Sequence, residues 1–277
     1  MRYTTRPPDQ PLAPYVDYLW YLRDTPTHST ERIVPTGTLE LVVNLHEDAV
    51  RVHDSRTGQW RRYSGAVVSG AHQRYFVADT RAHAAMVGVH FKPGGALPFL
   101  GIPPGELADQ HVDLELLWGR AAVDLRDRLC LATTTAARFA ELNRALRSRL
   151  PLSAPGHRAL PFALEQLARP EVTVGQVAAS VELSHRRFIQ VFTAEVGMPP
   201  KRLSRILRFQ RVSELARAGT PDWRQVAVAC GYFDQSHLIN EVGELTGATP
   251  VEMVRASARV KEFHLVDEGS IFSKTSR

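Results

Sequence analysis

The chain has 277 residues, of which 44% are hydrophobic and 23% charged, so it can bury a core and is not a disordered polymer. Its net charge of +5 at pH 7 is compatible with a nucleic acid partner but does not identify one. The N-terminal residues lack the apolar region of a signal peptide, and no apolar run approaches the ~18 residues of a membrane span. We therefore expect a cytoplasmic protein without membrane contacts.

Residues 1–150 are predicted to form a β-rich domain that ends in helices. In TLELVVNL (38–45) the apolar residues alternate, which places Leu39, Leu41 and Val43 on one face of a strand. Similar strand patterns occupy 65–70 and 83–91. The apolar spacing becomes helical from 113 to 149. The first half is thus expected to be a sheet or barrel followed by one or two helices.

Three features of this half allow two interpretations each. The aromatic cluster Tyr15, Tyr18, Trp20 and Tyr21 fits a ligand pocket or the cover of a core. The apolar seam Leu114, Leu117, Ala121 and Leu125 fits a dimer contact or packing against the sheet. The glycines of KPGGALPFLG (92–101) fit a phosphate loop or a turn before a helix, and the missing G-x-x-x-x-G-K-[ST] pattern favours the turn.

The histidines and cysteines predict neither a metal site nor a catalytic residue. His83 and His90 are seven residues apart, so on one strand they point to opposite faces. His46 and His53 have the same spacing, and the chain lacks an H-x-H pair there. Cys130 and Cys230 form no C-x-x-C pair and are interpreted as small apolar packing residues. We expect no cofactor; the alternative is a metal-dependent cupin-type enzyme fused to a DNA-binding module.

A linker at 151–157 is predicted to separate this half from a helical half at 158–258. There, residues 173–197 indicate two short helices with a tight turn. Thr173 and Ser184 are the expected N-caps, and Gly197 is the expected stop. This arrangement is the helix-turn-helix unit.

The same pattern returns at residues 222–247, where Asp234 is the expected N-cap and Gly247 the stop. The two second-helix caps, Ser184 and Asp234, are 50 residues apart. A helix between the units, of about 18 residues, would span about 27 Å. Two helices at its ends could enter successive major grooves, which lie ~34 Å apart.

The order and spacing of LSHRRFIQVFTAEVGMPPKRL, ILRFQRVSELA and VAVACGYFDQSHLINEVGELTGATP resemble the AraC family of bacterial transcription regulators. The resemblance implies DNA binding by both units, usually with an N-terminal sensor. It implies that the base-facing residues are Arg186, Ile189, Gln190, Gln235, Ser236 and Asn240. Expected phosphate contacts are Ser184, His185, Arg187, Lys201, Arg202 and His237.

The second unit departs from the family pattern in three places. Asn240 stands where arginine is common, Val242 where a bulky aromatic is usual, and Gly243 where a basic residue is usual. Glycine inside a helix costs ~1 kcal/mol relative to alanine. We therefore expect the first unit to supply most of the DNA affinity.

The fold class expected from these patterns is α+β. Residues 34–45 and 88–101 resemble the sensor-type domain of some of these regulators, which implies a cupin-like β-barrel with flanking helices. Double-stranded DNA is the expected partner; RNA polymerase, a second copy of the chain and an unidentified small-molecule effector are left open. A regulator whose N-terminal half makes only protein contacts is a further alternative. The tail at 259–277 is expected to be mobile or weakly packed.

Overall fold

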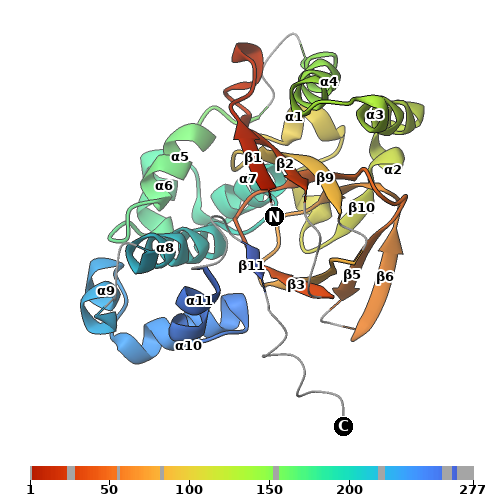
Figure 1. Cartoon of the computed structure of the whole chain (residues 1–277). Helices are drawn as coiled ribbons and strands as arrows, with labels where there is room; N and C mark the ends of the chain where they lie inside the picture. Colours follow the sequence, from red (N-terminus) through yellow and green to blue (C-terminus); the bar gives the residue numbers. More distant parts are fainter. Residues whose placement is uncertain are drawn as a thin grey trace.

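Two antiparallel β-sheets make up most of the N-terminal half in this computed structural model, which describes residues 2–23, 29–54, 57–81, 84–151, 156–217, 222–257 and 264–266. Figure 1 shows the sheets to the right of the C-terminal helices. The first sheet has the strand order β1 (Arg2–Arg6), β2 (Val16–Arg23), β9 (Ala85–Phe91), β4 (Glu40–Asn44), β7 (Ala66–Ser69) and β10 (His111–Asp113). The second has the order β11 (His264–Val266), β3 (Thr30–Ile33), β8 (Phe76–Asp79), β5 (Val50–Asp54) and β6 (Gln59–Tyr63).

The sheets do not close into the barrel that we expected. Within the described ranges the edge strands β1 and β10 form no ladder with β11 or β6, so two separate sheets remain. Strand β6 is one of these open edges, and Gln59, Trp60, Arg61 and Arg62 are all exposed, which is typical of an edge strand that meets solvent. The α+β class and the strands expected near 38–45, 65–70 and 83–91 are confirmed.

Short helices cover the first sheet and complete its core. Leu114, Leu125, Leu129 and Phe139 are buried, so the apolar seam packs inside the chain, although Ala121 is exposed. KPGGALPFLG forms a turn and then a helix, as expected. The elements are η1 (Gln10–Leu12), α1 (Leu97–Leu100), η2 (Pro104–Leu107), α2 (Leu114–Trp118), α3 (Arg120–Leu131) and α4 (Thr135–Arg147).

The aromatic cluster divides between the two interpretations that the sequence allowed. Trp20 lines a cavity between the sheets. Tyr21 is buried beneath the guanidinium of Arg138, and Tyr15 packs edge-on against Phe99. Most of the cluster therefore covers the core, and one member contributes to a cavity.

The C-terminal half is helical throughout its described residues up to 257. The helices are α5 (Leu160–Leu167), α6 (Val174–Ser180), α7 (His185–Val196), α8 (Pro200–Arg217), α9 (Trp223–Ala229), α10 (Gln235–Thr246) and α11 (Pro250–Ser257). Leu203, Ile206, Phe209 and Val212 of α8 are buried, whereas Leu215 near its end is exposed. One hydrophobic cluster runs through both halves of the chain.

One expectation about a single residue was wrong. Cys130 is exposed on α3, because its turn of the helix faces solvent, whereas Cys230 is buried as expected. The tail contributes β11, whose backbone pairs with β3. Three parts of the chain for which the sequence made predictions lie outside the described residues: the rest of the tail, residues 152–155 of the linker, and His83. No helix in the described ranges is long and apolar enough to cross a membrane.

Gly70 provides a test of the packing between β7 and the η2 region. A Cβ on Gly70 would lie 1.7 Å from the carbonyl oxygen of Leu107 and 3.0 Å from that of Gln110. Because backbone atoms cannot move aside cheaply, Gly70→Ala should lower the free energy of unfolding by about 2 kcal/mol. Gly243→Ala is the matched control, since its Cβ meets no atom within 4 Å. Because residue 243 lies inside helix α10, Gly243→Ala should raise the free energy of unfolding by about 1 kcal/mol. Urea unfolding in which both variants shift alike would contradict this account.

Candidate nucleic-acid interface

Helix α7, the second helix of the first unit, buries one face and exposes its first turns. The Oγ of Ser184 accepts a hydrogen bond from the backbone N of Arg187 at 3.3 Å, which fixes where the helix begins. Phe188 and Phe192 are buried, with ring centroids 5.6 Å apart. The opposite face is therefore available to a partner.

The residues predicted to contact DNA from α7 lie on this open face. Arg186, Arg187 and Gln190 are exposed, and Ile189 is half-buried. An Arg187 guanidinium nitrogen donates to Oε1 of Gln190 at 3.2 Å, so these two side chains are already positioned together. Ser184 and His185 are exposed at the start of the helix. Their individual roles stay predictions.

Helix α10, the second helix of the second unit, repeats this arrangement. Oδ1 of Asp234 accepts from the backbone N of His237 at 2.7 Å, and Leu238, Val242 and Leu245 are buried. Facing outward are Ser236, His237 and Asn240, which are exposed, and Gln235, which is half-buried. The five N- and C-cap positions expected for the two units are occupied as predicted: Thr173, Ser184, Gly197, Asp234 and Gly247.

An ion-pair network that the sequence did not reveal fixes α10 to α8. Only 4% of the Glu241 side chain is exposed, and its carboxylate accepts from Arg205 Nε at 2.7 Å and Arg208 Nη2 at 2.9 Å. Glu244 pairs with Arg205 at 2.5 Å and with Arg202 at 3.2 Å. The hydrogen bond from Arg205, followed by that from Arg202, lowers the pKa of Glu244. The network therefore sets the angle between the two helices.

Because of this network, part of the basic charge of residues 185–211 is paired within the domain and does not face solvent alone. Residues 185–211 hold seven basic side chains and one acidic one. Arg202, Arg205 and Arg208 face the carboxylates of α10, and Lys201 is exposed. The phosphate contact predicted for Arg202 would therefore compete with its ion pair to Glu244.

A separate cavity of about 90 Å³ lies between the two sheets. Apolar side chains such as Trp20, Val52 and Met86 form much of its wall. Its polar lining includes the imidazoles of His72 and His111. Their ring centroids are 4.7 Å apart, and Ser69 Oγ lies 3.3 Å from His111 Nε2.

Burial keeps both imidazoles uncharged. It lowers the pKa of His72 from 6.5 to about 4. Burial, followed by the repulsion that a protonated His72 would exert, lowers the pKa of His111 well below 6.5. Nε2 of His72 is buried and has no hydrogen-bond partner among the described residues. The cavity thus offers one unsatisfied polar atom in a mainly apolar wall.

Replacing Glu241 by glutamine should test the network under α10. The substitution leaves Arg208 and part of Arg205 facing a neutral amide in a buried site, so Glu241→Gln should lower the free energy of unfolding by about 3 kcal/mol. Glu165→Gln is the matched control, because Glu165 pairs with Arg169 in a largely exposed i, i+4 contact. That control should change stability by less than ~0.5 kcal/mol in chemical denaturation. Equal losses for the two variants would show that the Glu241 network adds no stability.

The buried imidazole of His72 should make the fold sensitive to acid. Its folded pKa lies below its unfolded value, so the unfolded chain binds more protons as the pH falls from 6.5 towards 4. His72 alone should therefore remove about 2 kcal/mol of stability between pH 7 and pH 4.5. His72→Gln should lose less stability than the parent over that interval in urea titrations. Parallel losses would mean that His72 is protonated equally in both states.

Two protein families match parts of the chain. Residues 4–113 match a domain of unknown function (DUF6597), and residues 177–256 match a helix-turn-helix domain. Comparison with curated proteins gave no significant match.

Solved structures resemble the chain only distantly. The apo form of a ToxT point variant from Vibrio cholerae strain SCE256 is 11% identical, with 86% of this chain and 97% of that chain covered and a TM-score of 0.48. Wild-type ToxT of that strain, bound to an unsaturated fatty acid, is 11% identical over 92% of this chain and 97% of that one, with a TM-score of 0.45. A DNA-binding transcriptional dual regulator from Escherichia coli K-12 is 24% identical over 37% of this chain and 98% of that one, with a TM-score of 0.31.

The family match and the paired units agree on the C-terminal half. Both units have the caps, turns and buried apolar stripes of helix-turn-helix motifs, and α8 joins them. The C-terminal half of the chain therefore carries a helix-turn-helix domain, which follows an N-terminal domain and resembles the paired units of AraC-type regulators.

Proposed function

We propose that this chain regulates transcription by placing α7 and α10 in two adjacent major grooves of one DNA duplex. The observation that carries the proposal is the repetition of one exposed, capped helix in each unit, one before and one after α8 in the chain. Helix α8 connects the two units, and its 18 residues give a length of about 27 Å, which is of the same order as the ~34 Å between successive grooves. A single chain would then make the paired contact for which many repressors need a dimer.

Base readout is assigned to polar side chains on the first turns of both helices. Arginine pairs with two acceptors of guanine, and glutamine or asparagine pairs with adenine. Arg186 and Gln190 would read one groove, and Gln235 and Asn240 the other, with Ile189 and Ser236 beside them. Ser184, His185, Arg187, Lys201, Arg202 and His237 would contact phosphates and fix the register.

The first unit would supply most of the affinity. Residues 184–196 contain two arginines and one glutamate, whereas residues 234–246 contain three carboxylates and neither lysine nor arginine. Phosphates attract the first surface more strongly, since neutralisation of phosphates supplies much of the affinity for DNA.

The cavity supports a second part of the proposal, regulation by a small effector. Its apolar wall and the unsatisfied Nε2 of His72 suit a small, mainly apolar molecule with one hydrogen-bonding group. An effector of this kind would bind away from DNA. The N-terminal domain would then modulate a reader located in the C-terminal half.

Fluorescence anisotropy on a duplex selected from a random pool by the full chain tests the reading role. Arg186→Ala should weaken binding to the selected duplex by about 1–3 kcal/mol and relax the preference at one base pair. Arg187→Ala is the comparison: it should weaken binding to all duplexes alike and reduce the salt slope by about 1. A uniform loss in Arg186→Ala would contradict its assignment to a base.

The same assay distinguishes the two units. Gln190→Ala should cost more affinity than Asn240→Ala, because its unit lies on the more basic surface. Equal losses would show that both units hold DNA with similar strength. Failure of the full chain to prefer any duplex over competitor DNA would overturn the proposed function itself.

A further inference from the structure

Both reading helices end on glycines that pack against the sheets. Gly197 ends α7 with φ +93°, and Gly247 ends α10 with φ +66°. A Cβ on Gly197 would lie 3.0 Å from Cβ of Ala71, and one on Gly247 would lie 2.6 Å from the ring of Tyr75. The short segment 71–76 therefore touches the ends of both helices.

The end of α10 is held by further polar contacts from the second sheet. Arg32 of β3 is 8% exposed, and its Nη1 donates to the carbonyl oxygens of Gly247 at 2.5 Å and Thr246 at 3.4 Å. The backbone N of Tyr75 donates to the carbonyl of Leu245 at 3.0 Å. The last carbonyls of a helix lack intrahelical donors and carry partial negative charge, so a guanidinium placed there fixes the helix end.

The residues that hold the helices alternate with residues that line the cavity. On β3, Glu31 and Ile33 line the cavity while Arg32 points to α10. This alternation follows from the period of two in a strand. In segment 71–76, His72 and Phe76 line the cavity while Tyr75 packs against Gly247.

The loop after β3 makes a third connection, to α8. The carbonyl of Thr36 accepts from Nε2 of Gln210 at 2.9 Å, and a Cβ on Gly37 would lie 2.6 Å from Leu203. Thr36 and Thr38 also line the cavity, and their hydroxyl oxygens are 2.8 Å apart. Residues 30–38 and 71–76 are thus a wall with the cavity on one side and the DNA-binding helices on the other; we call them the coupling wall.

We propose that the coupling wall sets the relative positions of α7 and α10, and that filling the cavity changes DNA binding through it. Packed interiors do not deform continuously, so an occupant that is larger or differently shaped than this space of about 90 Å³ displaces part of its lining. The displaced residues are the immediate neighbours of Arg32 and Tyr75. Because two adjacent grooves accept only a narrow range of helix placements, a small shift alters the affinity. This inference rests on the proposed function and assigns Arg32 and Tyr75 as positioning residues.

A double-mutant cycle in the full chain tests the coupling. Ala78 of β8 is buried and lines the cavity, so Ala78→Leu fills the cavity without a ligand. We expect it to change the Kd for the selected duplex by about fivefold or more. It should also change amide hydrogen exchange at residues 243–247. In an Arg32→Gln background, the effect of Ala78→Leu on both readouts should fall below about half its value in the parent chain, since contacting residues are not additive.

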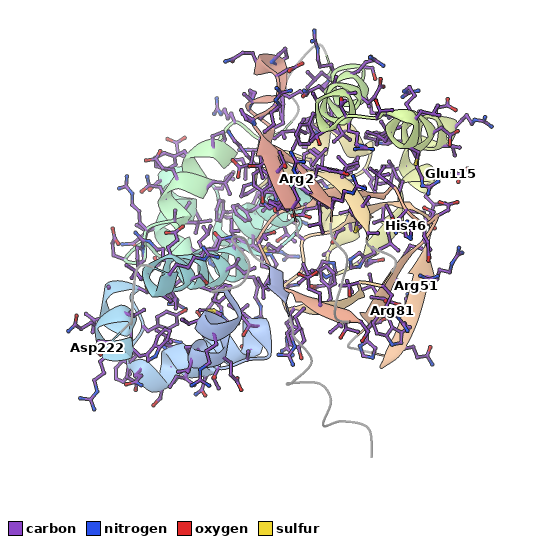
Figure 2. The ribbon with its side chains drawn as sticks, viewed as in Figure 1. Arg2, His46, Arg51, Arg81, Glu115 and Asp222 are labelled. Carbon is purple, nitrogen blue, oxygen red and sulfur yellow. The ribbon has the colours of Figure 1, made fainter. Side chains whose placement is uncertain are left out.

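Arg51→Gln is the matched control for Arg32→Gln. Arg51 lies in the same sheet, on β5, where it pairs with Glu47, and Figure 2 shows it at the edge away from the C-terminal helices. The effect of Ala78→Leu should be unchanged in this background. If thermal melting shows that Arg32→Gln is unfolded, Tyr75→Ala is the second uncoupling variant. If it shows that Ala78→Leu is unfolded, Ala78→Val fills the cavity with a smaller side chain.

Two results would overturn the coupling. One is a filled cavity that leaves both Kd and exchange at residues 243–247 unchanged. The other is an effect of Ala78→Leu that is equal in the Arg32→Gln, Arg51→Gln and parent chains. Hydrogen exchange needs no DNA, so it reports on the coupling even if the chain prefers no duplex. In that case the proposed function fails separately.

Discussion

The buried carboxylate of Glu241 is the interaction on which the geometry of the second unit depends. A carboxylate with 4% exposure is costly unless it is paired, and Arg205 and Arg208 supply that pairing from α8. The pairing requires one rotation of α10 about its axis, which also buries Leu238 and Val242 and turns Asn240 outward. The ion pairs therefore determine which side chains this helix can present to a partner.

The first unit is fixed by different means. Phe188, Phe192 and Val196 bury the inner face of α7, and the only acidic residue on this helix, Glu195, accepts hydrogen bonds from the backbone N of His157. The arginines of its first turns are thus left exposed. The first unit therefore exposes its arginines on the surface, whereas the arginines that contact the second unit pair with its buried carboxylate. This difference is a physical reason for the unequal DNA affinity that we propose, independent of the departures at Asn240 and Gly243.

Local signals in the sequence predicted the parts of the fold that depend on neighbouring residues. The caps Ser184 and Asp234 and the glycines Gly197 and Gly247 have recognisable patterns, because a cap acts within four residues. The closed barrel was wrong because strand closure depends on pairings between distant segments, and an edge such as β6 has no short-range signature. Glu241 lies three residues after Leu238 and four before Leu245, on the buried face of α10, but a carboxylate in this position does not reveal which distant cations pair with it. Arg32 and Gly247 are 215 residues apart, and no spacing rule connects them.

Because Arg32 and Gly247 are 215 residues apart in the sequence, their contact connects the N-terminal sheets to α10. A guanidinium bonded to the last carbonyls of a helix constrains that end, whereas Asp234 fixes the other end from within the unit. The N-terminal turns, which carry Gln235, Ser236 and Asn240, therefore receive their position from both halves of the chain. Contacts within the helical half alone therefore do not determine the placement of α10. If α10 binds DNA as we propose, the sheets influence that binding through Arg32 without touching DNA. The cavity behind β3 is lined by Glu31 and Ile33, the immediate neighbours of Arg32, so a change in its packing would reach the end of α10 through a single residue.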